Sequence, residues 1–153
     1  MSQKIIKVYI ENSVIGGYFD VEFMEQTRQL FQLFHNGNLY PVISYHVIKE
    51  LNDGAPQEVI DILSTIKYDI IKVTKEMEQL ADKYIEQGVV SENFRDDALH
   101  IAIATLSDVQ LLVSWNFRHI VNYRRIRLFN SVNIAEGYTL LEIRSPRELI
   151  ENE

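Results

Sequence analysis

Short apolar runs alternate along this chain with longer amphipathic stretches. The short runs are rich in β-branched and aromatic residues, as is typical of buried strands. They cover residues 5–10, 39–43, 68–73 and 111–114. The longer stretches repeat their apolar residues at helical spacing, and they cover residues 22–36, 57–66 and 74–87. Strands and helices that alternate in this way favour a parallel sheet with helices on both faces.

Smaller signals complete this prediction. Ser44 is a suitable N-cap for a short helix that carries Glu50 near its end, and residues 52–56 form a predicted loop. Residues 117–130 are mixed and predict helix only in pieces, whereas residues 132–138 are ambiguous. Residues 140–143 suggest a short edge strand, and the capping box that begins at Ser145 predicts a terminal helical turn.

The most apolar helix is predicted to begin near Arg95, and it opens with two adjacent carboxylates, Asp96 and Asp97. Residues 98–104 leave almost no polar face, so we expect most of this helix to be buried. The helix dipole favours negative charge in the first turn, and for Asp96 this account suffices. For Asp97 a second account competes, in which the side chain joins other carboxylates in a cleft and a divalent cation offsets their repulsion.

Composition limits the classes of protein to consider. At 153 residues, with 46% hydrophobic and 24% charged residues, we expect one soluble domain spanning residues 1–153. There is neither a run of about 20 apolar residues, as a membrane span needs, nor a signal-peptide pattern. The chain has no cysteine, which excludes disulfides and thiolate metal sites and fits a cytoplasmic location. A net charge of −7 argues against binding nucleic acid over the whole surface, although arginines cluster between Arg118 and Arg127.

Three carboxylates stand at the junctions where a ligand cleft of an open α/β sheet forms. Glu11 follows the first strand, Glu50 lies after the second, and Asp97 opens the buried helix; Asn116 follows the fourth strand. Hard oxygen ligands of this kind suit Mg²⁺ or Mn²⁺. Taken alone, Glu11 is more often a solvated loop residue, and Glu50 more often an exposed helix residue paired with a neighbour such as Lys49.

Four stretches resemble, in order and spacing, the four motifs of PIN domains, in particular those of toxin ribonucleases of the virulence-associated protein C type. They are residues 7–15, 43–50, 97–102 and 112–117, and the resemblance extends from Lys4 to about residue 150. It implies a PIN-like three-layer α/β/α sandwich with a mostly parallel sheet of four to five strands. It also implies a metal-dependent endoribonuclease that acts as a homodimer and is the toxin of a type II toxin–antitoxin pair, with a protein antitoxin as partner.

Carried over residue by residue, the resemblance makes Glu11, Glu50 and Asp97 the ligands of Mg²⁺ or Mn²⁺ and places Asn116 where many members have a fourth acid. Ser13 and Ser114 match hydroxyls near the first and fourth positions. Two departures stand out. The first acid is usually Asp, and Glu11 is one methylene longer; Asn116 removes one negative charge, which weakens binding of a second metal.

Other residues near these motifs have two interpretations each. Arg118 and Arg124 suit phosphate contacts, or they form a solvated or partner-facing surface. His100 is more often a packed histidine bonded to an acid than a group that positions a phosphate. Trp115 is more often core than a stacking platform for an RNA base. Tyr18 is either core or part of a partner surface.

The resemblance therefore implies hydrolysis of RNA phosphodiester bonds, in which one carboxylate helps to take a proton from the attacking water. The alternative is a catalytically weakened PIN-fold module that binds RNA or a protein without turnover. A metal-dependent phosphatase has no support, because no strand ends in a paired Asp-x-Asp.

Overall fold

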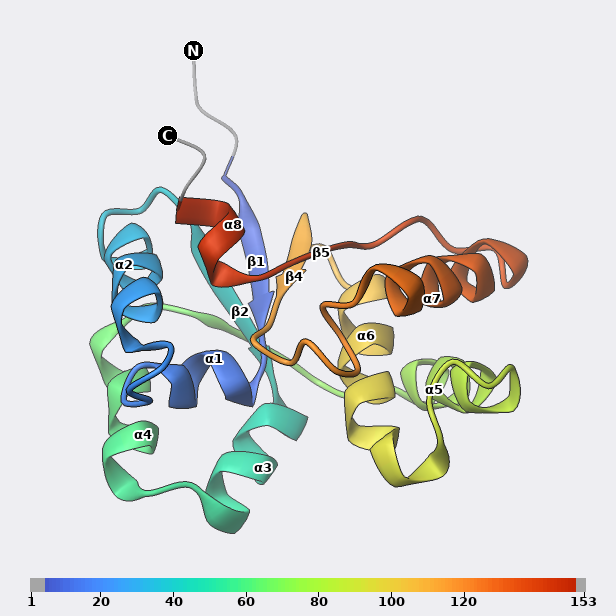
Figure 1. The fold of residues 1–153 in the computed structure, drawn as a ribbon, viewed down its shortest axis with the longest axis horizontal. Coiled ribbons are helices and arrows are strands. Elements are labelled where there is room, and N and C mark those ends of the chain that lie inside the picture. The colour runs from blue at the N-terminus through green and yellow to red at the C-terminus, as the bar shows by residue number, and fades with distance from the viewer. Residues whose placement is uncertain (1–4, 151–153) are drawn as a thin grey trace.

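The computed structural model describes residues 5–150 and contains a five-stranded sheet between two layers of helices (Figure 1). The strands pair in the order β3-β2-β1-β4-β5, and every pair is parallel. They are β1 (Lys7–Ile10), β2 (Tyr40–Ser44), β3 (Asp69–Ile71), β4 (Leu111–Val113) and β5 (Glu142–Arg144). The predicted strands are all present, and β5 lies at one edge of the sheet as expected.

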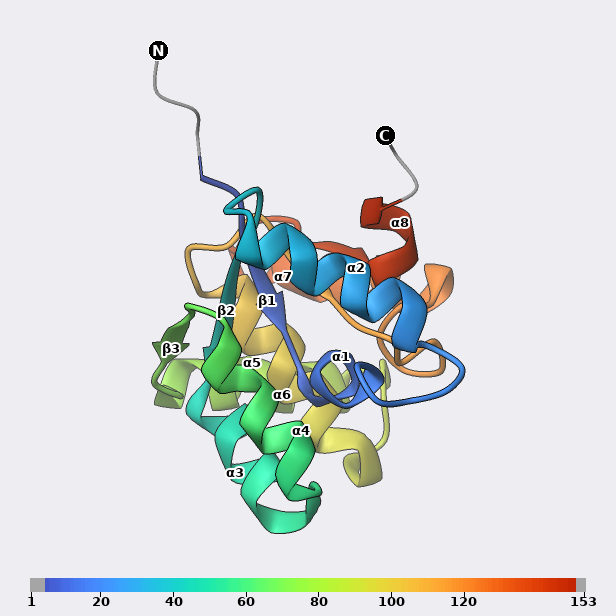
Figure 2. The same cartoon turned by 90° about the vertical axis from the view of Figure 1, so that its left-hand side faces the viewer.

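Helices cover both faces of the sheet. They are α1 (Asn12–Gly17), α2 (Met24–His35), α3 (Tyr45–Gly54), α4 (Gln57–Ile62), α5 (Lys75–Glu86), α6 (Arg95–Thr105), α7 (Tyr123–Ala135) and α8 (Pro146–Ile150). Helices α1, α2 and α4 lie on one side, and α5, α6 and α7 lie on the other (Figures 1 and 2). This arrangement confirms the predicted α/β/α sandwich. None of the helices in the described range is long and apolar enough to cross a membrane.

Strand β1 occupies the centre of the sheet, where it is covered from both faces. Val8, Tyr9 and Ile10 are fully buried, which is why this strand has a continuous apolar run instead of an alternating pattern. The chain passes from β1 to β2 on one side and later returns to β4 on the other side. The carboxyl end of β1 is therefore a topological switch point, where open α/β sheets bind their ligands.

Helix α6 is buried as its composition predicts. Seven consecutive residues, 98–104, are buried, because the helix packs between the sheet and α5 (Figure 1). Its first turn remains at the carboxyl edge of the sheet. The fold thus anchors Asp97 on one of its most firmly packed elements.

Helix α7 differs from the prediction, since it is one continuous helix and not helical pieces. Asn122 caps it by accepting a hydrogen bond from the Arg125 N–H at 3.2 Å. The sequence pattern is obscured because Asn133 is fully buried. There Asn133 accepts a hydrogen bond from the Tyr84 hydroxyl on α5, so a polar residue occupies a core position that apolar periodicity cannot detect.

Two further differences from the prediction are the end of α3 and the presence of helix α1. Helix α3 continues to Gly54, so the predicted loop at residues 52–56 shrinks to Ala55 and Pro56. Proline disfavours helical backbone at the residue before it, and Ala55 is accordingly extended, with ψ 144°. The short helix α1 was not predicted; it starts directly after Glu11, which is its N-cap.

Candidate active site

Glu11 at the end of β1 caps a helix and is also one of the predicted metal ligands. As N-cap of α1, its carboxylate accepts a hydrogen bond from the Ser13 N–H at 3.3 Å and another from the Ser13 hydroxyl. Only 5% of the residue is exposed. Burial raises the pKa of Glu11, although the nearby His100 and the hydrogen bonds from Ser13 and Ser114 oppose the shift. Between residues 5 and 150, no lysine or arginine forms an ion pair with this carboxylate.

Ser13 and Ser114 join the carboxyl ends of β1 and β4. Their hydroxyl oxygens lie 3.4 Å apart. The Ser13 hydroxyl accepts a hydrogen bond from the Trp115 N–H, and the Ser114 hydroxyl accepts one from the Asn116 N–H, both at 2.9 Å. The two serines therefore fix the backbone that carries Glu11 and Asn116, and Ser114 is fully buried while doing so.

Glu50 reaches the same edge from α3. Ser44 caps this helix as predicted, because its hydroxyl accepts a hydrogen bond from the Val47 N–H at 3.2 Å. The Oε1 atom of Glu50 lies 2.6 Å from Nε2 of His100. Burial alone raises the pKa of Glu50, but the hydrogen bond and charge of His100 outweigh it and lower the pKa below its ordinary value.

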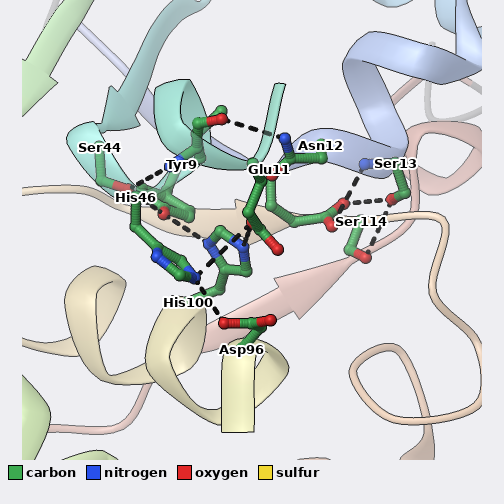
Figure 3. A network of polar contacts seen from close by, with 11 residues as sticks. Tyr9, Glu11, Asn12, Ser13, Ser44, His46, Asp96, His100 and Ser114 are labelled. Carbon is green, nitrogen blue, oxygen red and sulfur yellow. Dashed lines mark hydrogen bonds and ion pairs between the residues drawn. The ribbon is translucent and has the colours of Figure 1, made fainter. Parts of the chain in front are cut away.

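His100 interacts with all three acids, since Glu50 contacts its ring and the charges of Glu11 and Asp97 also act on it. Figure 3 shows the ring within the network of polar contacts that includes Tyr9 and His46. Its Nδ1 atom lies 2.8 Å from the Tyr9 hydroxyl, which lies 2.9 Å from the Ser44 hydroxyl. Burial favours the neutral ring, but the Glu50 hydrogen bond and the charges of Glu50, Glu11 and Asp97 together raise the pKa of His100. The interpretation of His100 as a packed histidine bonded to an acid is confirmed.

Asp97 is held by two residues that follow β4. Its Oδ2 atom lies 3.2 Å from Nδ1 of His119, and the Asn116 side chain donates a hydrogen bond to it. The Asn116 oxygen accepts the His119 N–H at 2.9 Å, so both ends of this amide are engaged. Burial raises the pKa of Asp97 despite the neighbouring histidines. Asn116 thus orients Asp97 in this structure.

The neighbouring Asp96 has a different environment. It is exposed at the first turn of α6, as the helix-dipole account predicts. Its Oδ1 atom also lies 3.0 Å from Nε2 of His46 on α3. Sequence reasoning missed His46 and His119 as site residues. The available signal for His46 was its spacing of four residues from Glu50, which places both on one side of a helix.

Trp115 belongs to the core. Its ring stacks on Phe23 with the ring centroids 4.3 Å apart, and its Nε1–H donates to the Thr27 hydroxyl at 2.8 Å. Only 6% of the residue is exposed, so the packing interpretation is confirmed. Tyr18, which had two interpretations, packs partly buried against the same core.

Arg118, Arg124 and Arg125 line a hollow of about 350 Å³ together with Gly88, Val89, Asn122 and Leu128. Arg125 is a structural residue, since its guanidinium donates to the backbone oxygens of Arg118 and Val89. The Arg118 guanidinium lies 5.8 Å from the Phe94 ring centroid. Phe94 in turn packs on His119, the partner of Asp97.

The structure places the three predicted metal ligands near the carboxyl edge of the sheet without bringing their oxygens together. Within residues 5–150, only His46, Glu50 and His100 have ligand atoms that all lie within 4.8 Å of one another. Glu11, Glu50 and Asp97 come from three different elements, and each is at least partly removed from water. The charge of His100 opposes the effect of burial on the pKa of all three acids, and Lys49 adds a further charge near Glu50. Carboxylates that are desolvated near one another repel, and a cation that accepts oxygen ligands would offset this repulsion.

No protein-family model matches this sequence, and no curated protein matches it significantly. Solved structures do match. One is a chain in the crystal structure of VapBC2 from Rickettsia felis bound to a DNA fragment from its promoter, with 17% identity, a TM-score of 0.61, and coverage of 92% of this chain and 98% of that chain. Another is Mycobacterium tuberculosis VapC20, a Sarcin-Ricin loop cleaving toxin, with 16% identity, a TM-score of 0.55, and coverage of 88% and 98%. The likeness is one of fold, and it confirms the predicted PIN-type, VapC-like architecture.

Proposed function

We propose that this chain, which has the fold of VapC toxins, is a metal-dependent endoribonuclease acting as one domain over residues 1–153. One observation carries the proposal: Glu11, Glu50 and Asp97, from three separate elements, all act electrostatically on His100 at the carboxyl edge of a parallel sheet. This edge is where α/β sheets bind ligands. A buried acid group with no lysine or arginine partner is costly for stability and indicates a functional role.

In this proposal, Glu11, Glu50 and Asp97 hold Mg²⁺ or Mn²⁺. When bound, such an ion supplies charge neutralisation for a phosphoryl group and makes a water molecule a better nucleophile. Asp97 is a suitable acceptor for the proton of that water, because burial raises its pKa. Ser13 and Ser114 keep Glu11 in place, and Asn116 keeps Asp97 in place, through the hydrogen bonds described above.

Arg118 and Arg124 are the proposed contacts to the RNA backbone. Both side chains are exposed and line the same hollow, and guanidinium groups bind phosphate oxygens in a bidentate manner. The stack of Phe94 on His119 connects this hollow to Asp97. A phosphate held by Arg118 and Arg124 would thus place the neighbouring part of an RNA strand beside the carboxylates.

We further propose that the chain is the toxin of a type II toxin–antitoxin pair, located in the cytoplasm, with a protein antitoxin and a second copy of itself as partners. The support is the fold shared with the VapBC2 and VapC20 structures together with the four motifs in the sequence. Cleavage of the Sarcin-Ricin loop is a property of VapC20. For this chain we propose only RNA as the substrate class.

The test is cleavage of a structured RNA pool by the purified protein with Mn²⁺, compared with EDTA and with Asp97→Asn. Asp108→Asn is the matched control, because Asp108 is exposed in the loop that precedes β4, at the opposite end of that strand. We expect cleavage by the wild type and by Asp108→Asn, and a loss of at least about 100-fold with Asp97→Asn or EDTA.

Cleavage that survives Asp97→Asn would contradict the assigned site. RNA binding without cleavage at any Mn²⁺ concentration would instead support the alternative, a PIN-fold module that binds RNA or protein without turnover.

A further inference from the structure

Helices α3 and α6 face each other at the carboxyl edge of the sheet, and each contributes a pair of side chains spaced four residues apart. Helix α3 carries His46 and Glu50, and α6 carries Asp96 and His100. Residues four apart lie on the same side of a helix, so the two pairs meet in the space between α3 and α6. Figure 3 shows His46, His100 and Asp96 gathered there. The proposed nuclease site uses only Glu50 of these four residues.

The distances within this group suit a small cation. Nε2 of His46 lies 3.0 Å from Oδ1 of Asp96 and 3.8 Å from Oε1 of Glu50. Oε1 of Glu50 lies 2.6 Å from Nε2 of His100, and the ligand atoms of His46, Glu50 and His100 are all within 4.8 Å of one another. Tetrahedral zinc with ligands at about 2.0–2.2 Å separates them by about 3.4 Å. Small side-chain adjustments therefore bring the ligand atoms of His46, Glu50 and His100 to bonding distance, and Asp96, which lies 3.0 Å from His46, is the nearest source of a fourth ligand.

One atom of the group lacks the hydrogen bond that its burial requires. Nε2 of His46 is buried, and within the described part of the chain its one close polar neighbour besides Glu50 is the exposed Asp96 carboxylate at 3.0 Å, with which it forms no well-aligned hydrogen bond. Buried polar atoms of native proteins are nearly always satisfied, and an exception often marks a missing ion or water. A cation between α3 and α6 would satisfy this nitrogen.

The surroundings of His100 support the same role. A metal-binding histidine usually donates its second ring N–H to a neighbouring oxygen, which fixes the ring. Nδ1 of His100 faces the Tyr9 hydroxyl, which can accept this proton and donate its own to Ser44. Both of these partners are fully buried. The chain of Ser44, Tyr9 and His100 thus holds Nε2 toward Glu50 and His46.

We propose that His46, Glu50, Asp96 and His100 form a second metal site, for a divalent transition-metal ion of the Zn²⁺ class and not for Mg²⁺. Two imidazole nitrogens and two carboxylate oxygens suit such ions, whereas Mg²⁺ prefers oxygen ligands alone. The ion would tie α3 to α6 and fix the orientation of Glu50. The site shares the Glu50 carboxylate with the proposed nuclease site, but its metal binding can be measured without any cleavage.

The test is titration of the metal-free protein with Co²⁺, in the presence of excess Mg²⁺ to occupy oxygen-only sites, followed by visible absorption and calorimetry. We expect a single tightly bound Co²⁺ per chain with the absorption of nitrogen-containing coordination, and its displacement by Zn²⁺. His46→Ala and Asp96→Asn should weaken binding by at least about tenfold. His35→Ala is the matched control, since His35 is exposed at the end of α2.

Melting of each metal-free variant shows whether it is folded. Unchanged Co²⁺ absorption in folded His46→Ala, or equal loss in His35→Ala, would overturn the proposed second site. Asp97→Asn separates the two proposals: it should abolish cleavage with Mn²⁺ while Co²⁺ absorption persists. Absence of cleavage in all proteins with intact Co²⁺ binding would refute the nuclease and leave the second site standing.

Discussion

Nε2 of His100 lies 2.6 Å from Oε1 of Glu50. Glu50 lies on α3, which follows β2, and His100 lies on α6, which precedes β4; these two strands flank β1 in the sheet. On its other side, the same ring contacts Tyr9 in the middle of the sheet. His100 therefore connects Tyr9 in the buried core to Glu50 at the carboxyl edge of the sheet.

The His100–Glu50 pair should make stability depend on pH in a defined direction. The folded-state pKa of His100 is raised, so its contribution is complete below the ordinary histidine pKa of about 6.5 and is lost as pH rises through the folded-state value. In EDTA, we expect His100→Gln to lower the free energy of unfolding by about 1–2 kcal/mol at pH 6 and by less at pH 9. Urea unfolding at both pH values measures this. An equal loss at pH 9 would mean that the folded ring is neutral.

Replacement of Glu11 should raise the melting temperature and lower the cleavage activity. Burial raises the folded-state pKa of Glu11, so the ionised carboxylate costs stability that increases as pH rises above the ordinary value of about 4.3. We expect Glu11→Gln to melt a few degrees higher than the wild type in EDTA at pH 7.5, with a smaller difference at pH 5. Cleavage with Mn²⁺ should fall by about 10–100-fold or more. A variant that melts lower at pH 7.5 would contradict this account.

Arg124 should contribute to RNA binding through a phosphate. In the Asp97→Asn background, which prevents cleavage, we expect Arg124→Ala to weaken binding of single-stranded RNA and to reduce the magnitude of its log–log salt slope by about 0.7–1. Fluorescence anisotropy at several salt concentrations measures both quantities. Arg127→Ala is the matched control, since Arg127 is also exposed on α7 but contacts Tyr123 outside the hollow. The same effect from both variants would argue against a defined phosphate site.

Gly17 should be required where α1 packs against the core. A Cβ atom at this position would lie 2.8 Å from the Thr27 hydroxyl and 2.9 Å from the Trp115 ring, which are joined by a buried hydrogen bond. We expect Gly17→Ala to cost about 1–3 kcal/mol in urea unfolding. Gly16→Ala meets no atom within 4 Å and should be neutral or stabilising by up to about 1 kcal/mol. Equal effects of the two substitutions would rule out this close approach.

Local patterns predicted most of the secondary structure because burial leaves a simple periodic signature. The apolar run before Glu11 became the central strand, and the nearly all-apolar segment after Asp97 became the buried helix α6. The continuous helix α7 was missed because Asn133 fills a core position with a polar side chain bonded to Tyr84. A hydrogen bond between distant elements satisfies such a residue, and nothing in its local sequence announces this partner.

By itself, the sequence determined the alternation of strands and helices and the placement of Glu11, Glu50 and Asp97 at their junctions, since both depend on neighbours along the chain. Only the tertiary structure decided that the charges of these acids all act on His100, that Asn116 and His119 hold Asp97, and that His46 meets Asp96. The physical reason is that protonation and metal affinity depend on which charges and hydrogen bonds lie within a few ångströms. Those distances are set by the packing of α3 and α6 at the end of a shared sheet, and not by spacing along the chain.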